Sequence, residues 1–180
     1  MKRLPLYIGG FLGPLGTLAM VPMIPELRDE FGASTSAVSW GITGYLLALA
    51  LFLLVAGTIG ERFGRRRTVR TTYLVYAAAS IGCALAPSLG LFVTGRVIQG
   101  IANAFITPLL LAALADATSA GRVGRSIGVY GSFQALGGAG APLLGGLAAD
   151  VGWRWGFVLV GLMSVALAGF PPAGGPQSER

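Results

Sequence analysis

Long apolar stretches separated by short polar ones run along the whole sequence. Six of them approach the roughly 17 to 25 apolar residues that a helix needs to cross a bilayer. They cover residues 6–23, 37–59, 69–86, 89–113, 126–149 and 155–170. The last stretch is short and stops at Pro171 and Pro172, which cannot continue a helix. The pattern therefore predicts an all-α polytopic membrane protein, with six transmembrane helices over residues 1–170 and a polar tail over residues 171–180.

The first stretch has a second interpretation, because Lys2 and Arg3 precede it as they would precede a signal peptide. It has no clear small-x-small cleavage site, and it runs into Pro22 and Pro25 instead. These features favour a retained membrane span.

Composition agrees with a membrane protein. Hydrophobic residues make up 54% of the chain, charged residues only 11%, and the mean hydropathy is +0.73, whereas a soluble domain carries about 25% charged residues. The net charge of +6 does not indicate a nucleic-acid partner, because the basic residues lie at the ends of the apolar stretches. The chain has no histidine, and Cys83 is its one cysteine, so we expect no metal site, no cofactor and no enzymatic activity.

The basic residues also predict an orientation. If the N-terminus is cytoplasmic, most of them fall on the cytoplasmic side: Lys2, Arg3, Arg62, Arg65, Arg66, Arg67, Arg70, Arg122, Arg125 and Arg180. The other side then holds Arg28 and Arg154 among several acids. The positive-inside rule predicts a multi-pass protein of the plasma membrane with both termini and the tail in the cytoplasm.

Two polar segments resemble each other across the membrane. Residues 57–65 read GTIGERFGR and residues 146–154 read GLAADVGWR, so each has a glycine, an acid four residues later, another glycine and an arginine. The first follows span two and the second follows span five, on opposite faces. Such a pattern predicts an inverted 3+3 repeat, a common plan of secondary transporters. The same residues would also suit any tight turn at a membrane surface.

The first segment carries a family motif. It reads Gly57-x-x-x-Glu61-Arg62-x-Gly64-Arg65-Arg66. It is similar to the loop motif Gly-x-x-x-Asp-Arg-x-Gly-Arg-Arg of the major facilitator superfamily, with Glu61 in place of aspartate. Gly64 permits a turn that other residues resist, and the arginines suit an anionic inner leaflet. The resemblance implies a gating loop, whose acid docks on a helix N-terminus of a second half; an anchored hairpin without gating is the alternative.

A polar stripe runs through the fourth span. Arg96, Gln99, Gly100, Asn103 and Thr107 recur at helical spacing, and Arg96-x-x-Gln99-Gly100 resembles a signature of the same superfamily. Polar side chains within a span should face the bundle interior or a wet cavity. Arg96 could instead extend its head to the membrane surface. The resemblance implies that the stripe lines a transport path and takes part in proton coupling.

The fifth span is rich in small residues. The segment Gly137-x-x-x-Ala141-Pro142-x-x-Gly145-Gly146 resembles the antiporter signature of the superfamily, with Ala141 replacing a glycine. Residues 137, 141 and 145 form one ridge of small residues, and residues 138, 142 and 146 form the adjacent ridge. Such ridges allow two helices to approach closely, and Pro142 should bend the helix. Close packing alone would explain the pattern equally well. Tyr130 and Gln134 of the same span could line the cavity beside Asn103, or could make ordinary interhelical hydrogen bonds.

Together these motifs make the chain similar to the N-terminal six-helix half of a major facilitator superfamily transporter, closest to the proton-coupled drug exporters. The resemblance implies alternating-access transport of a small-molecule substrate and of protons. It also implies a second six-helix half, either another chain or a copy of this one. No acid lies within a span, and arginine does not readily release its proton, so the titrating group must come from a helix end or the partner half. The alternative is a truncated, non-transporting remnant, or a regulatory half that binds a full-length transporter.

Overall fold

A computed structural model describes residues 4–172, apart from the side chain of Glu61. Every regular element in this range is helical. Six long helices form the body: α1 (Leu4–Leu18), α3 (Thr35–Phe63), α4 (Arg65–Ala84), α5 (Leu89–Asp116), α6 (Val123–Val151) and α7 (Trp153–Ala168). The shorter elements are η1 (Val21–Met23), α2 (Ile24–Phe31) and η2 (Ala120–Arg122). Most of the predicted tail, residues 173–180, lies outside the described residues.

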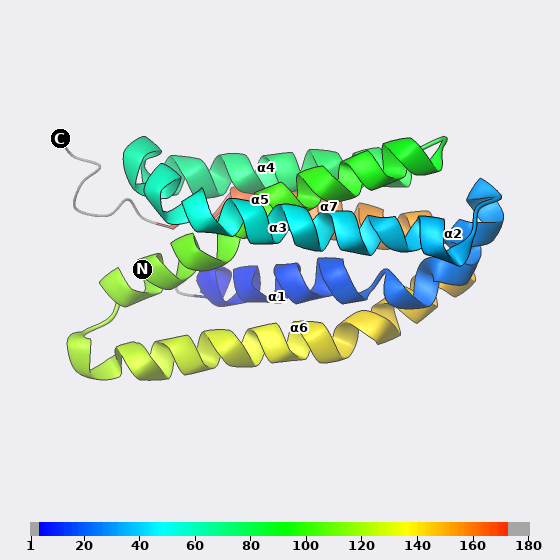
Figure 1. Cartoon of the computed structure of the whole chain (residues 1–180). Helices are drawn as coiled ribbons and strands as arrows, with labels where there is room; N and C mark the ends of the chain where they lie inside the picture. Colours follow the sequence, from blue (N-terminus) through cyan, green and yellow to red (C-terminus); the bar gives the residue numbers. More distant parts are fainter. Residues whose placement is uncertain (1–3, 173–180) are drawn as a thin grey trace.

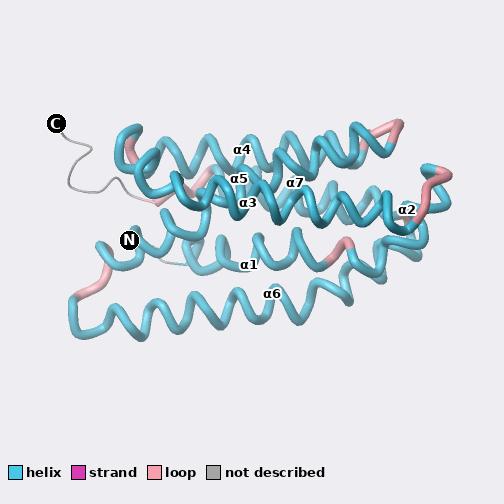
Figure 2. Tube along the Cα trace, viewed as in Figure 1, coloured by secondary structure: helices cyan, strands magenta, loops and turns pink. Residues whose placement is uncertain are grey.

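The long helices run side by side along one axis and alternate in direction (Figures 1 and 2). The α3–α4 and α5–α6 connections lie at the end where α1 begins, which we call the Gly64 end. The connections from α2 to α3, α4 to α5 and α6 to α7 lie at the opposite, Gly152 end. The main interfaces are formed by α3 and α4 on α5, by α1 on α6 and by α4 on α7.

The helices overlap the predicted spans, and the first span differs most. α1 stops at Leu18, and a 3₁₀ turn containing Pro22 follows, because proline has no N–H to continue the helical ladder. The chain then continues as α2 until Gly32, whose φ of 57° ends the helix in the left-handed region. Half of the residues in α2 are charged, so the apolar pattern could not predict this helix.

Three helical segments in the described range are long and apolar enough to cross a membrane: Leu4–Phe31, Thr35–Gly60 and Leu89–Asp116. Trp153–Ala168 is apolar but shorter. α4 begins with three consecutive arginines and α6 is rich in glycine, which lowers the hydropathy of both. Large apolar side chains face outward on several helices, for example Leu54, which is 84% exposed. In a bilayer this surface would contact lipid tails.

Candidate functional site

Arg96 is fully buried in the described bundle, about two turns from the start of α5 at the Gly152 end. Its Nε donates to the Gly41 carbonyl of α3 at 3.1 Å, and its Nη1 donates to the Gly16 carbonyl of α1 at 2.9 Å. One guanidinium therefore joins the backbones of α1 and α3 to α5. Arg96 does not extend to the membrane surface, because these bonds hold it in the interior.

Aromatic rings enclose the same guanidinium. Its central carbon lies 4.5 Å from the ring centroid of Tyr45 and 5.8 Å from that of Phe157. Such cation–π contacts are worth more in a desolvated site than at a surface. Within the described residues, no carboxylate bonds Arg96, and its Nη2 has no hydrogen-bond partner. The charge is stabilised by backbone dipoles, an amide and ring faces.

Gln99 connects Arg96 to α4. Its Oε1 accepts from Arg96 Nη1 at 2.7 Å, and its Nε2 donates to Ser80 Oγ at 2.7 Å. Ser80 in turn donates to the Tyr76 carbonyl at 2.8 Å. All three side chains in this chain of bonds are fully buried, so the orientation of the Gln99 amide fixes one edge of the guanidinium.

Asn103 and three tyrosines complete a buried polar cluster. We call the following set the polar centre: Tyr45, Tyr73, Tyr76, Ser80, Arg96, Gln99 and Asn103. The Tyr45 hydroxyl interacts with the side chains of Tyr76 and Asn103. The Tyr73 hydroxyl is buried without a hydrogen-bond partner among the described atoms. The polar centre lies inside this half, shared by α3, α4 and α5, with α1 packed against it.

The glycines of α1 make room for these side chains. A Cβ on Gly13 would lie 3.0 Å from Asn103 Oδ1, and one on Gly16 would collide with the Tyr76 hydroxyl. Gly9 faces the Tyr73 hydroxyl and Gly10 faces the Tyr130 ring in the same way. The backbone of α1 therefore packs directly against the side chains of the polar centre.

The other residues of the predicted path are only partly brought together. Tyr130 is buried and its hydroxyl donates to Thr107 Oγ1 at 3.4 Å. Gly100 is a close-packing position, because a Cβ there would collide with the Tyr45 backbone. Gln134 is half-buried on α6, without a hydrogen bond to described residues.

The small residues of α6 form a contact with α1. Gly137, Ala141 and Gly145 are buried; a Cβ on Gly137 would lie 2.6 Å from the Phe11 carbonyl oxygen, and one on Gly145 would collide with that of Ala19. The adjacent ridge is more open, since Pro142 is exposed and nothing lies within 4 Å of a Cβ on Gly146. α6 remains helical through Pro142.

The predicted gating loop is a turn of a single residue. Gly64, with φ 82° and ψ 124°, ends α3 and begins α4, so Arg62 belongs to α3 and Arg65 to α4. Arg65 forms an ion pair with Asp116 at the end of α5. Arg66 is exposed, and the helical position of Gly57 faces open space. The Glu61 side chain lies outside the described part of the structure.

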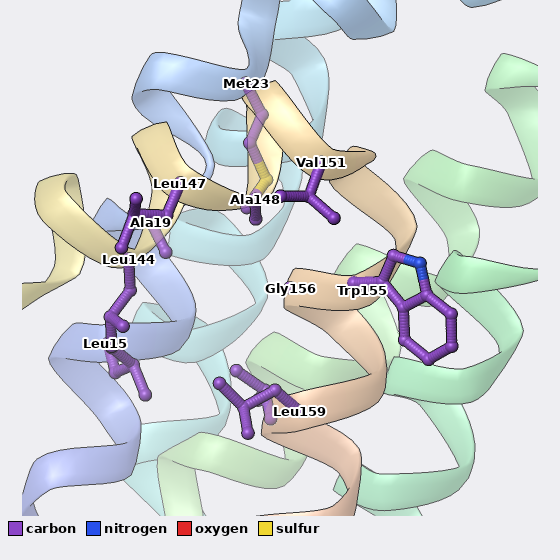
Figure 3. A pocket seen from close by; sticks show the side chains of 11 residues that line it. Leu15, Ala19, Met23, Leu144, Leu147, Ala148, Val151, Trp155, Gly156 and Leu159 are labelled. Atoms are coloured by element: carbon purple, nitrogen blue, oxygen red, sulfur yellow. The ribbon is translucent and has the colours of Figure 1, made fainter.

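A separate pocket opens at the Gly152 end between α6 and α7, with α1 as its floor (Figure 3). Its volume is about 200 Å³, and apolar residues such as Leu15, Met23, Leu147 and Leu159 line it. None of the residues predicted for the transport path lines this pocket. The polar centre and the pocket are therefore distinct features.

The sequence analysis missed Tyr45, Tyr73, Tyr76, Ser80 and the glycines of α1. A signal for the glycines was present, because Gly9, Gly13 and Gly16 recur at helical spacing and mark a close-packed face. Tyr45 and Tyr76 gave no such signal, since aromatic residues are frequent throughout membrane helices.

The apolar exterior, the alternating long helices and the buried polar centre define a polytopic helical membrane protein. The family model of the Major Facilitator Superfamily matches residues 6–177. The chain therefore belongs to this superfamily of membrane transporters, as its motifs predicted.

Several curated proteins are similar to it. The multidrug resistance protein B homolog of Mycobacterium tuberculosis is 40% identical over 143 residues, covering 77% of this chain and 26% of that protein. The drug efflux pump JefA of the same organism is 36% identical, covering 76% of this chain and 27% of that protein. The MFS antiporter QDR3 of Candida albicans is 32% identical, covering 88% of this chain and 23% of that protein. The chain thus spans about a quarter of the length of these relatives.

Solved structures share the fold. A D-xylose-proton symporter matches with a TM-score of 0.81 at 18% identity, over 98% of this chain and 49% of that one. A bacterial homolog of the human lysosomal transporter Spinster matches with a TM-score of 0.80 at 20% identity, over 99% of this chain and 46% of that one. The chain spans about half the length of these structures, and at such identities the match establishes the fold alone.

Proposed function

We propose that the chain forms one six-helix half of an exporter that moves several drugs across the plasma membrane in exchange for protons. The observation that carries this proposal is Arg96, a buried cation with an unpaired Nη2 in the polar centre. Ionisable residues inside a membrane domain are costly and are functional-site candidates by default. The names of the relatives, multidrug resistance protein and drug efflux pump, support drugs as the substrate class.

A second six-helix half would complete the transport path. The solved neighbours are about twice as long as this chain, which supports a partner half in the same chain, in another chain or in a second copy. The two halves would rock against each other by alternating access, and the turn at Gly64 would close the cytoplasmic side when Glu61 docks on the partner. The arginines at the Gly64 end support a cytoplasmic location of that end.

The proton would be carried by a group outside the polar centre of this half. Within the described residues, the acids lie in α2 and near the ends of α5 and α6, away from Arg96. Arginine keeps its proton, so Arg96 would act by its field, favouring the charged form of a nearby acid from the second half. Binding of the substrate would then compete with binding of that proton, as an exchange of the two requires.

We also propose that the half is an inverted 3+3 repeat. Three observations support it: α3 packs extensively on α5 as α6 does on α1, Gly64 and Gly152 are both single-residue turns of positive φ, and an arginine after each glycine forms an ion pair. Arg65 pairs with the end of α5, and Arg154 pairs with Glu30 at the end of α2. Each pair joins one three-helix unit to the other, at opposite ends.

The test begins with the tagged chain purified from its native membrane in mild detergent, with identification of every subunit by mass spectrometry. A complex with a second six-helix half, a homodimer, or a longer polypeptide that contains both halves is expected. The complex is then reconstituted into proteoliposomes, and the efflux of a fluorescent lipophilic cation is followed under an imposed pH gradient. Arg96→Lys should abolish proton-driven efflux, whereas Arg125→Lys, an exposed control, should not. A stable monomer without efflux would favour a non-transporting remnant or a regulatory half.

A further inference from the structure

The first turns of α4 present arginines that the protein itself does not neutralise. Arg65 faces α5 and pairs with Asp116. Arg66, Arg67 and Arg70 are exposed, and none of them forms a hydrogen bond or ion pair with described residues. At 3.6 residues per turn these three positions share one side of the helix. A cluster of three cations therefore faces outward at the Gly64 end.

The same face of α4 continues as an apolar stripe. Leu74 and Ile81 are 46% and 36% exposed, and their helical positions follow those of the arginines along one side. The opposite side of α4 packs on α5 and α7. A cationic cluster with an apolar stripe directly beside it matches the two chemical parts of a phospholipid.

We propose that this face of α4 binds an anionic phospholipid, with the phosphate held by Arg66, Arg67 and Arg70 and an acyl chain lying along Leu74 and Ile81. Guanidinium groups bind phosphate oxygens with paired, charge-assisted hydrogen bonds. Basic clusters next to a membrane helix attract anionic lipids. The apolar stripe favours a lipid over free phosphate, because burial of each methylene adds to the binding free energy.

The site is independent of what the chain transports. It uses residues that point away from the polar centre, and its location fits the headgroup level of the leaflet at the Gly64 end. Arg122 and Arg125 provide a comparison at that same end. Arg122 already donates to Ser119 Oγ at 3.0 Å, and no third arginine joins the two.

The chain is reconstituted into nanodiscs of phosphatidylcholine with a minor share of phosphatidylglycerol, and the lipids retained after mild extraction are counted by native mass spectrometry. Phosphatidylglycerol should be enriched over its share in the nanodisc. In Arg66→Gln/Arg70→Gln this enrichment should fall roughly tenfold or more. Arg122→Gln/Arg125→Gln removes the same charge at the same end and should reduce it by less than about twofold.

Further measurements make the result decisive. Arg66→Lys/Arg70→Lys keeps the charge and should retain part of the enrichment, and inorganic phosphate or glycerol phosphate should not displace the lipid. If the glutamine variant does not fold, raising the salt concentration on the wild-type chain must still release phosphatidylglycerol. Equal losses in both glutamine variants, no enrichment in the wild type, or displacement by free phosphate would overturn the proposal.

Discussion

Arg96 and Arg65 are both cations in contact with other helices, and they are stabilised in different ways. Arg96 is fully buried and binds two backbone carbonyls and the Gln99 amide. The Arg65 side chain is 19% exposed and pairs with Asp116, which is 48% exposed. The charge of Arg96 is stabilised by dipoles from three helices, whereas the charge of Arg65 is stabilised by one partly exposed acid. Substitutions of the charged side chains should therefore have graded effects, large in the polar centre and small at the turn.

Replacing Arg96 tests the strong side of this comparison. Arg96→Met removes three hydrogen bonds and two ring contacts, and it leaves Gln99 Oε1 with only the weak Cys83 thiol as a donor. The free energy of unfolding should fall by about 3 kcal/mol or more, because buried groups lose charged partners. Unfolding in mixed micelles, followed by tryptophan fluorescence, measures it. Arg62→Met, at an exposed position, is the control; equal effects of the two changes would contradict the comparison.

Close packing around the polar centre can be tested without altering charge. Gly100→Ala places a Cβ against the Tyr45 backbone, which cannot move without shifting α3 and the ring on Arg96. Overpacking of this kind costs about 1–3 kcal/mol.

The matched control is Gly57→Ala, near the turn, where nothing lies within 4 Å of the new Cβ. Alanine should stabilise that helical position slightly, by roughly 0.5–1 kcal/mol. The same unfolding measurement applies to both variants, and a loss at Gly57 as large as that at Gly100 would show that the predicted difference in packing is absent.

The sequence was sufficient for the helices of the bundle but not for the contacts of its centre. Hydropathy and polar spacing place the helices and the stripe of α5, because lipid imposes an apolar exterior whatever the neighbours are. Asn103 and Gln99 point inward for the same reason. Two of the three hydrogen-bond partners of Arg96 are the carbonyls of Gly16 and Gly41, and backbone atoms leave no chemical signature in a sequence.

α2 and Ser80 show two other limits. α2 follows a proline break and is rich in charged residues. A search for apolar stretches therefore stops before the first residue of α2. Ser80 looks like an ordinary small residue of α4, and only the packing of α4 on α5 reveals that it orients Gln99. Both depend on tertiary contacts that local patterns do not encode.

The backbone of the turn should be more sensitive than its charges. Gly64 has φ 82°, in a region that costs L-residues about 1–3 kcal/mol. Gly64→Ala should lower the unfolding free energy by about that amount and should also misdirect the start of α4. Gly64→Asn should be about as destabilising as alanine, because asparagine tolerates positive φ mainly in the αL region and the ψ of 124° at Gly64 lies outside it. If alanine and asparagine were equally harmless, backbone conformation would not control this turn.

The ion pair at the turn should contribute least. A double-mutant cycle of Arg65→Gln and Asp116→Asn isolates its coupling energy from the effects of each single change. Both side chains are partly exposed, so the coupling should be about 0.2–1 kcal/mol and should shrink as salt is added. The corresponding cycle for Arg154→Gln and Glu30→Gln probes the pair at the Gly152 end, whose side chains are 43% and 40% exposed. Because Arg65 is the less exposed arginine, its cycle should give the larger value; the reverse order would show that exposure does not rank these two contacts.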